Sequence, residues 1–267
     1  MKKTILITGA TDGIGLATAR KLAGDGHKVL LHGRNQSKLE AVRQELEAMP
    51  GVDGIESFVA DLSHLDEVDA LAEAVIERHD KLDVLINNAG IFKTKDPLTR
   101  DGLDVRFMVN TIAPYQLTRR LMSLIGPAGR VINLSSAAQA PVNIEALSGQ
   151  LRLDAMDAYA QSKLAITMWS ALMAKEAGSP VISAVNPGSL LASKMVKEGF
   201  GLAGNDIGIG VDILTRASLD ESFADKSGEY FDNDSGRFAL PQADAQNPAK
   251  VSETVQAIEA VLAQLNA

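Results

Sequence analysis

The sequence predicts an α/β fold in which helices flank one doubly wound, mostly parallel sheet of seven strands, within a single domain that spans residues 1–267. Two observations carry this prediction. Short aliphatic runs recur along the chain, and amphipathic stretches with helical periodicity separate them. We find no proline- or serine-rich linker, low-complexity tract or internal repeat, so one domain is the simpler partition.

The aliphatic runs have the length and composition of strands that are buried on both faces of a parallel sheet. An alternation of such strands with helices requires right-handed crossover connections, and these produce the doubly wound arrangement. The sequence locates six of the strands, at residues 4–7, 28–31, 55–59, 84–86, 130–134 and 181–185. Helices are expected at residues 14–24, 37–48, 64–79, 103–125, 155–177, 206–218 and 249–265.

Two segments, about residues 137–154 and 187–205, lack clear periodicity. Each follows a predicted strand, and the C-terminal ends of strands in such a sheet face the ligand crevice. We therefore expect an active-site loop at residues 137–158 and a lid segment at residues 187–205.

The composition excludes several classes of function. The net charge is −8 and the isoelectric point is about 5.1, which argues against a nucleic-acid surface. There is no cysteine, and the four histidines show no metal-ligand spacing, so no metal site is expected. No apolar run approaches the ~20 residues of a membrane span, so we expect a cytoplasmic protein without a membrane contact.

A glycine-rich turn directly follows the first predicted strand and opens the first helix. Its glycines allow a tight turn, a close approach of the backbone to a pyrophosphate, and close packing of the helix on the strand. The helix N-terminus adds free N–H groups and a positive dipole. The strand before and the helix after favour a Rossmann-type dinucleotide site over a plain turn. The residues of this site are Gly9, Thr11, Asp12, Gly13, Ile14 and Gly15.

The end of the second strand indicates which nicotinamide cofactor binds. A site for NAD(H) needs an acidic residue there, whereas the 2′-phosphate of NADP(H) needs a cation. The chain has Gly33-Arg34-Asn35 at this point and no carboxylate. The guanidinium fork of Arg34 suits a phosphate, so we predict NADP(H) rather than NAD(H), with Arg34 and Asn35 in the site. The alternative is that Arg34 is only a surface charge.

Tyr159 and Lys163 are four residues apart and therefore project from the same face of the predicted helix. A phenol normally loses its proton only near pH ~10, and a neighbouring ammonium group lowers that pKa. The spacing favours an acid/base pair. The alternative is a half-buried ring with a solvated charge beside it.

Together with these features, Asn87-Asn88-Ala89-Gly90 after the fourth strand and Ser135-Ser136 after the fifth make the chain resemble the short-chain dehydrogenase/reductase family. The likeness covers about residues 4–190, and Asp61-Leu62 and Pro187-Gly188 also match. It implies a catalytic set of Asn110, Ser136, Tyr159 and Lys163. It also adds to the cofactor site Asp61, Leu62, Asn88, Ala89, Gly90, Tyr159, Lys163, Pro187, Gly188 and Ser193.

The resemblance also implies a role for each catalytic residue. Tyr159 exchanges the proton with the substrate oxygen, Lys163 lowers the pKa of Tyr159 and binds the nicotinamide ribose, and Ser136, rather than Ser135, holds the substrate oxygen. Because Pro114 has no N–H, the carbonyl of Asn110 loses its helical partner. It is then free to hold a water, which the family uses in a proton relay. The alternative is that Pro114 only kinks a helix.

The chain departs from the family pattern in two places. Tyr159 follows Ser136 by 23 residues, a longer interval than in most members. This longer segment, with Gly228-Glu229-Tyr230-Phe231, is similar to the branch of retinol dehydrogenases and protochlorophyllide reductases, without establishing a retinoid substrate. In the lid, the family's hydroxyl residue falls on Ala192, so we expect Ser193 to replace it through a one-residue loop difference.

The resemblance implies an NADP-dependent oxidoreductase that interconverts a small-molecule alcohol and a carbonyl compound by hydride transfer. A non-catalytic NADP(H) sensor and an interaction protein on the same fold are the alternatives. Family members commonly pair through the helices predicted at residues 103–125 and 155–177, so a homodimer or homotetramer is also an expectation.

Overall fold

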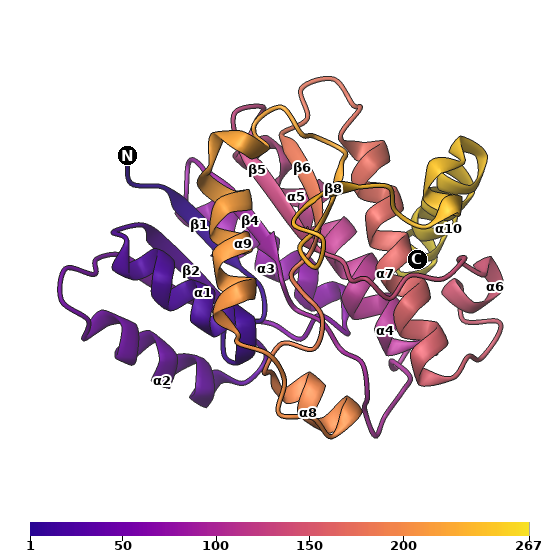
Figure 1. Cartoon of the computed structure of the whole chain (residues 1–267), viewed down its shortest axis with the longest axis horizontal. Coiled ribbons are helices and arrows are strands. Elements are labelled where there is room, and N and C mark those ends of the chain that lie inside the picture. Colours follow the sequence, from indigo (N-terminus) through magenta and orange to yellow (C-terminus); the bar gives the residue numbers. More distant parts are fainter. Residues whose placement is uncertain (267) are drawn as a thin grey trace.

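In the computed structural model, which describes residues 1–266, the strands form one sheet with the order β3-β2-β1-β4-β5-β6-β7-β8 (Figure 1). Neighbouring strands are parallel from β3 through β7, and β8 is antiparallel to β7. Strand order reverses between β1 and β4, and this is where the crevice of a doubly wound sheet opens. The strands are β1 (Thr4–Ile7), β2 (Lys28–Gly33), β3 (Ile55–Val59), β4 (Val84–Asn87), β5 (Arg130–Leu134), β6 (Val181–Asn186), β7 (Tyr230–Asp232) and β8 (Arg237–Ala239).

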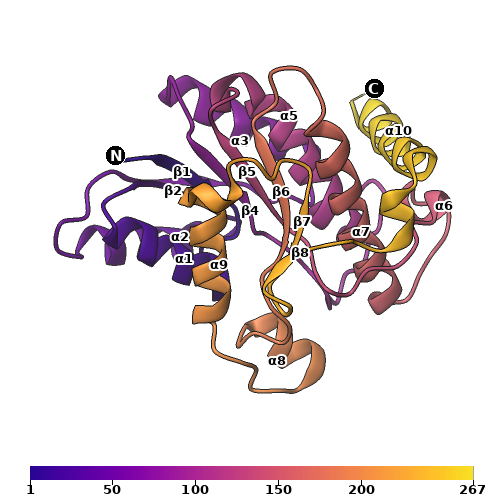
Figure 2. The ribbon, with the colours of Figure 1, turned by 45° about the horizontal axis from the view of Figure 1, so that its top comes forward.

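Helices cover both faces of this sheet, which confirms the predicted fold class (Figure 2). One face carries α1 (Gly13–Gly24), α2 (Gln36–Glu47) and α9 (Gly208–Leu219). The other face carries α3 (Leu65–Arg78), α5 (Ala113–Ile125) and α7 (Ala155–Met173). Fully buried apolar side chains fill both layers, among them Leu22 and Ile213 on the first face and Phe107 and Trp169 on the second.

The prediction of seven strands was wrong, because the described chain has eight. Strands β7 and β8 form a hairpin of two three-residue strands. Strands this short show no alternation of apolar and polar residues, so the sequence pattern gave no signal for a hairpin. The hairpin joins the sheet through the pairing of β7 with β6. An aromatic cluster packs against it, in which the rings of Phe231 and Phe238 lie 5.0 Å apart and both contact Phe223.

The single helix expected at residues 103–125 is interrupted. It consists of α4 (Val105–Phe107), a π-helical turn (Met108–Ile112) and α5. Pro114 is the second residue of α5 and cannot donate a backbone hydrogen bond to the preceding turn. A wider turn before it accommodates the missing donor, and such π turns are frequent at functional sites.

The last helix, α10 (Pro248–Leu265), packs on the outer side of α7. Tyr115 of α5 also reaches it, since its hydroxyl donates to Glu259 at 2.7 Å. Pairing of two chains through α5 and α7 stays a prediction. None of the described helices is both long and apolar enough to cross a membrane.

Both segments without periodicity contain short helices. The active-site loop includes α6 (Ile144–Leu147), and the lid includes α8 (Lys194–Phe200), which lies apart from the two helical layers (Figures 1 and 2). Two 3-10 turns, Glu221–Phe223 and Ala243–Gln246, complete the C-terminal part.

Candidate active site

The glycine-rich turn between β1 and α1 has the geometry of a phosphate cradle. Gly9 and Gly13 have φ angles of +67° and +55°, which favour glycine. A Cβ atom on Gly15 would lie 2.3 Å from the Gly9 carbonyl oxygen, so α1 approaches the turn at a distance that only glycine allows. Asp12 caps the helix, since its Oδ1 accepts from the Gly13 N–H at 2.7 Å. These residues fit a bound pyrophosphate at the N-terminus of α1.

The lid segment, residues 187–205, passes close to this cradle. A Cβ atom on Gly13 would lie 3.6 Å from the Ser193 Cβ, so the lid passes over the N-terminus of α1. The Ser193 hydroxyl caps α8 by accepting from the Val196 N–H at 3.3 Å. The start of the lid is fixed by the β7–β8 hairpin, because Asn233 Nδ2 donates to the Pro187 carbonyl at 2.9 Å. Gly188 follows with a φ of +122°.

The segment after β4 joins the cradle to the predicted catalytic residues. Asn88 Nδ2 donates to the carbonyls of Thr8 at 2.8 Å and Gly9 at 3.1 Å, and the Ala89 N–H donates to the Thr8 hydroxyl at 3.0 Å. A Cβ atom on Gly90 would lie 3.6 Å from Lys163 Nζ. The backbone of this segment therefore lies between the cradle and Lys163.

Arg34 lies exposed at the end of β2 and makes no ion pair within the part of the chain that the structure describes. Asp61 lies near it, after β3. Burial alone would raise the pKa of the Asp61 carboxyl, but hydrogen bonds from the Ser63 N–H and hydroxyl, and the charge of Arg34, bring this pKa below its ordinary value. The exposed guanidinium of Arg34 thus marks the position predicted for the 2′-phosphate.

Two other residues predicted for the cofactor site have structural roles. Asn35 Oδ1 accepts from the Lys38 N–H at 2.9 Å and so caps α2, while the Leu62 side chain is buried in the core.

His32 is a structural support of the cradle that the sequence reasoning missed. Its ring is buried in β2, where Nδ1 accepts from the Gly9 N–H at 3.2 Å and Nε2 lies 3.0 Å from the Ala60 carbonyl oxygen. Burial lowers the pKa of His32 to about 4, so the ring is neutral and carries its proton on Nε2. A polar residue within an otherwise aliphatic strand was the available signal.

This neutral ring predicts a loss of stability in acid. The pKa is about 4 in the folded chain and ~6.5 in the unfolded chain, so the stabilisation is complete above pH ~6.5 and is lost as the pH falls toward 4. The free energy of unfolding should decrease by up to about 3 kcal/mol over this range through His32. Urea unfolding at pH 7 and pH 5 should record about 2 kcal/mol of this decrease. A His32→Asn variant should show a smaller decrease, and an equal decrease in both proteins would contradict the assignment.

Lys163 and Tyr159 lie beside one another on α7. The buried ammonium group of Lys163 donates to the Leu134 carbonyl at 2.7 Å and lies 5.7 Å from the centroid of the Tyr159 ring. Burial lowers the pKa of Lys163 to about 8. Tyr159 does not have the lowered pKa that we expected. Burial raises it, and a hydrogen bond with the Ser136 side chain opposes only part of the increase.

The two serines after β5 have different surroundings. The Ser135 hydroxyl bonds to α7, where it donates to the Lys163 carbonyl at 3.0 Å and lies 2.7 Å from the Thr167 hydroxyl. The Ser136 hydroxyl accepts from the Ala138 N–H at 3.1 Å and bonds to Tyr159. The structure therefore brings Ser136, and not Ser135, to the phenol.

Asn110 lies fully buried in the π-helical turn. Its Oδ1 accepts from the Ile91 N–H at 2.8 Å, and its Nδ2 donates to the Ile91 carbonyl and to the Ser162 hydroxyl, each at 3.0 Å. The Ser162 hydroxyl in turn donates to the Tyr159 carbonyl at 2.7 Å. The side chain of Asn110 thus ties the segment after β4 to the turn of α7 that carries Tyr159. A water at its backbone carbonyl stays a prediction.

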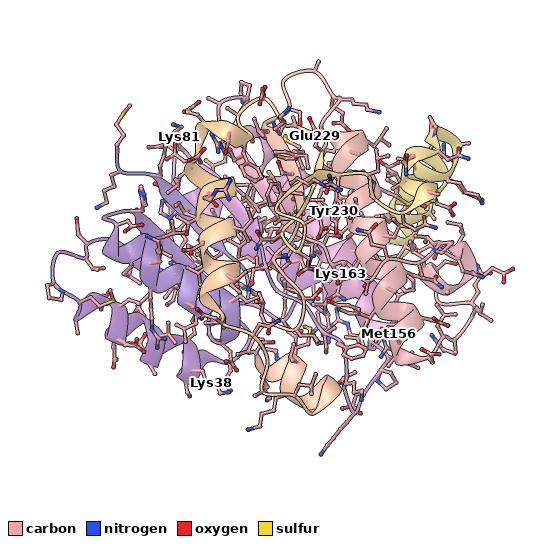
Figure 3. All side chains as sticks on the ribbon, viewed as in Figure 1. Lys38, Lys81, Met156, Lys163, Glu229 and Tyr230 are labelled. Atoms are coloured by element: carbon pink, nitrogen blue, oxygen red, sulfur yellow. The ribbon has the colours of Figure 1, made fainter. Side chains whose placement is uncertain are left out.

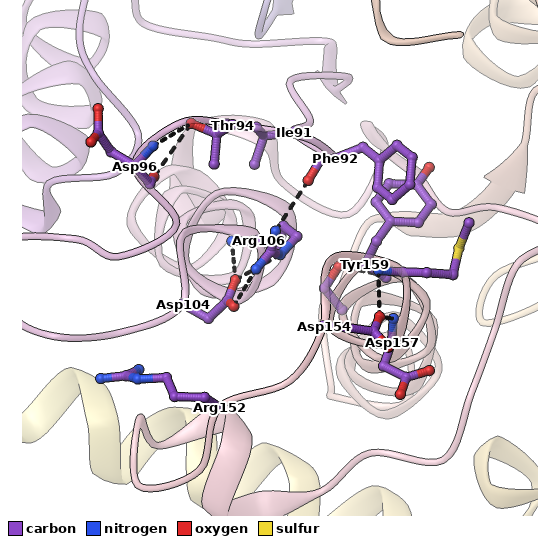
Figure 4. Close-up of polar contacts among 12 residues, drawn as sticks. Ile91, Phe92, Thr94, Asp96, Asp104, Arg106, Arg152, Asp154, Asp157 and Tyr159 are labelled. Atoms are coloured by element: carbon purple, nitrogen blue, oxygen red, sulfur yellow. Dashed lines mark hydrogen bonds and ion pairs between the residues drawn. The ribbon is translucent and has the colours of Figure 1, made fainter. Parts of the chain in front are cut away.

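Phe92 forms an apolar wall beside Tyr159, and this wall was also missed. The two ring centroids are 5.2 Å apart (Figure 4). Arg106 donates to the Phe92 carbonyl at 3.3 Å and makes a two-point ion pair with Asp104, at 2.9 and 2.6 Å, with both side chains buried. A Cβ atom on Gly199 would lie 2.8 Å from the Phe92 ring, so the lid helix α8 also packs against Phe92.

Residues 3–200 match the family model described as short chain dehydrogenase. Human retinol dehydrogenase 13 is 30% identical over 269 residues, which cover 93% of this chain and 81% of that protein. Among solved structures, a metagenomic short-chain oxidoreductase in complex with NADP is 31% identical, with a TM-score of 0.62 over 83% of this chain and 93% of that one. An uncharacterized protein from Mycobacterium paratuberculosis is 25% identical, with a TM-score of 0.80 over 97% and 92% of the two chains.

Proposed function

Because the chain belongs to the short-chain dehydrogenase family, we propose that it is an NADP-dependent oxidoreductase that interconverts a small-molecule alcohol and the corresponding carbonyl compound. The observation that carries this proposal is the convergence of Tyr159, Ser136 and Lys163 at the end of β5. The nicotinamide cofactor supplies or accepts the hydride when bound.

Residues of the chain transfer the proton that accompanies the hydride. In the direction of reduction, the Ser136 and Tyr159 hydroxyls bind the carbonyl oxygen, and Tyr159 donates its proton to that oxygen. The buried Lys163 ammonium, 5.7 Å from the ring centroid, stabilises the phenolate that remains. In the direction of oxidation, the same phenolate accepts the proton of the alcohol.

A cavity of about 340 Å³ lies beside Ala137, between the active-site loop and the β7–β8 hairpin. Gln139, Asp232, Leu240 and Gln242 are among its lining residues. Among the described residues, its lining also includes Tyr230 but none of Asn110, Ser136, Tyr159 and Lys163, so we do not assign this cavity to the substrate.

The choice of NADP(H) over NAD(H) depends on Arg34. Its guanidinium is exposed at the end of β2, no carboxylate follows that strand to bind a ribose 2′-hydroxyl, and a relative was crystallised with NADP. Asp61, the nearby acid, already accepts two hydrogen bonds from Ser63.

An Arg34→Ala variant should lower kcat/KM for NADPH by about 10- to 100-fold, the range expected for loss of a charge-assisted hydrogen bond. The value for NADH should remain within twofold, because NADH has no 2′-phosphate. An Arg216→Ala variant, which removes an exposed arginine from α9, is the matched control and should behave as the parent. Equal losses with both cofactors would contradict the role of Arg34.

A screen of carbonyl compounds with NADPH, and of alcohols with NADP, tests the proposed activity through the NADPH absorbance. The panel should begin with retinal and retinol, since human retinol dehydrogenase 13 is a relative, and extend to aromatic and aliphatic ketones. Turnover of at least one pair is expected. Tight NADPH binding without turnover of any compound would instead favour a sensor.

A further inference from the structure

The backbone carbonyl of Ser136 accepts hydrogen bonds from two side chains. The Tyr230 hydroxyl donates to it at 3.1 Å, and Gln139 Nε2 donates at 3.0 Å. Gln139 Oε1 in turn accepts from the Gln242 N–H at 2.9 Å. Tyr230 belongs to β7 and Gln242 to the segment before α10, so the C-terminal part of the chain is bonded directly to the end of β5.

Tyr230 is well placed to act as a fixed donor. Its position is set on both sides, because it pairs with Ala184 of β6 and with Ala239 of β8. The side chain, labelled in Figure 3, is buried. Burial, together with the charges of Asp232 and Asp234, raises the pKa of the Tyr230 phenol above its ordinary value. The hydroxyl therefore keeps its proton and remains a donor throughout the neutral and moderately alkaline range.

The orientation of the Ser136 peptide decides where the Ser136 hydroxyl lies. The hydroxyl accepts from the Ala138 N–H at 3.1 Å, within a tight turn that begins at Ser136. Residue 136 has no further strand pairing to hold it, since β5 ends at Leu134. The two bonds to its carbonyl, together with the bond from the Ala138 N–H, therefore hold the turn against rotation.

We infer that Tyr230 is a positioning residue of the proposed reaction, which holds the Ser136 carbonyl and thereby keeps the Ser136 hydroxyl on Tyr159. Gln139, the second donor to the Ser136 carbonyl, has the same positioning role. This inference rests on the proposed function, because only in that reaction does the Ser136 hydroxyl bind the substrate oxygen.

Loss of the Tyr230 hydroxyl should have two effects that a loss of packing would not produce. Ser136 would align the substrate oxygen less well, and its bond to Tyr159, which lowers the pKa of that phenol, would weaken. The charged groups around the two hydroxyls are Lys163 on α7 and Asp232 and Asp234 beyond Tyr230, and a Tyr230→Phe substitution changes none of them. A shift of the pH profile would therefore report on Ser136.

The chain has three tyrosines, and changing each to phenylalanine gives a matched set. Tyr230→Phe should lower kcat about tenfold and raise the pH midpoint of alcohol oxidation by about 0.5–1 unit, with the Kd for NADPH within twofold of the parent. Tyr115→Phe is the control. It removes the hydroxyl of another buried tyrosine, which is bonded to Glu259 of α10 and to Arg119, and it should leave kcat and the midpoint unchanged.

Tyr159→Phe separates this inference from the proposed function. If Tyr159→Phe abolishes turnover while Tyr230→Phe has the kcat and pH midpoint of the parent, the positioning role is wrong and the proposed function stands. If Tyr159→Phe retains turnover, the proposed function itself is wrong.

Gln139→Glu is a second variant in case Tyr230→Phe does not fold. It retains an acceptor for the Gln242 N–H and loses the donor to Ser136. Because the added carboxylate raises the pKa of Tyr159 by itself, only kcat is compared for this variant. It should fall, and the parent kcat would overturn the inference.

Discussion

Tyr159→Phe should reduce turnover in both directions by about 10²- to 10⁴-fold, the usual contribution of a positioned general acid or base. The substitution removes only the hydroxyl. The ring remains beside Phe92, 5.2 Å between centroids, so the wall of the site should stay in place. The expected loss therefore falls on kcat, because residue 159 of α7 can no longer donate a proton to the substrate oxygen or accept one from it.

NADPH binding is the control for this variant. The cradle at Gly9, Gly13 and Gly15 and the cation at Arg34 are separate from the phenol, so the Kd for NADPH, followed by fluorescence, should remain within a few-fold of the parent. Rates measured at saturating NADPH then report the chemical step. Turnover within a few-fold of the parent would contradict the role of Tyr159.

The parallel part of the fold was predictable because each buried strand is an aliphatic run and each crossover is an amphipathic helix. The same reasoning did not reveal the β7–β8 hairpin, whose strands are only three residues long, or the π-helical turn before Pro114. Local patterns describe elements that are long enough to repeat. They do not describe a three-residue strand whose place depends on pairing with a distant strand and on contacts with Phe223.

The candidate site was predictable where spacing and strand ends bring residues together. Tyr159 and Lys163 share one face of α7, and Ser136 follows β5 toward them. The residues that were missed, His32 and Arg106 among them, are polar side chains inside apolar surroundings. His32 bonds to backbone atoms of Gly9 and Ala60, and Arg106 pairs with Asp104 only two residues before it, a common spacing of charged residues, so no motif marks either residue.

The segment between Ser136 and Tyr159 was also predictable only in part. Its length was predicted to depart from the family pattern, but its short helix α6, capped by Asn143, has no periodic signal. The anchoring of this loop through Gln139 to Gln242 also depends on a residue 103 positions later in the chain. Such a contact exists only once the C-terminal part has folded onto the sheet.

Arg106→Met should lower the free energy of unfolding by about 3–5 kcal/mol, since it leaves the buried Asp104 carboxylate without its cation. Methionine retains much of the volume, so the loss is mainly electrostatic. Arg106 also holds the Phe92 carbonyl, which means that the wall beside Tyr159 should loosen and turnover should fall with stability (Figure 4).

Two further variants decide whether the orphaned charge causes this loss. Adding Asp104→Asn to Arg106→Met removes the charge but keeps a side-chain oxygen for the Arg106 N–H at the start of α4, so the double variant should recover at least half of the lost stability in urea unfolding. Arg20→Met breaks a two-point pair with Glu45 that is nearly half exposed, and it should cost less than about 1 kcal/mol. A double variant no more stable than Arg106→Met would show that lost packing, and not the buried charge of Asp104, accounts for the effect, because the two proteins differ only in that charge.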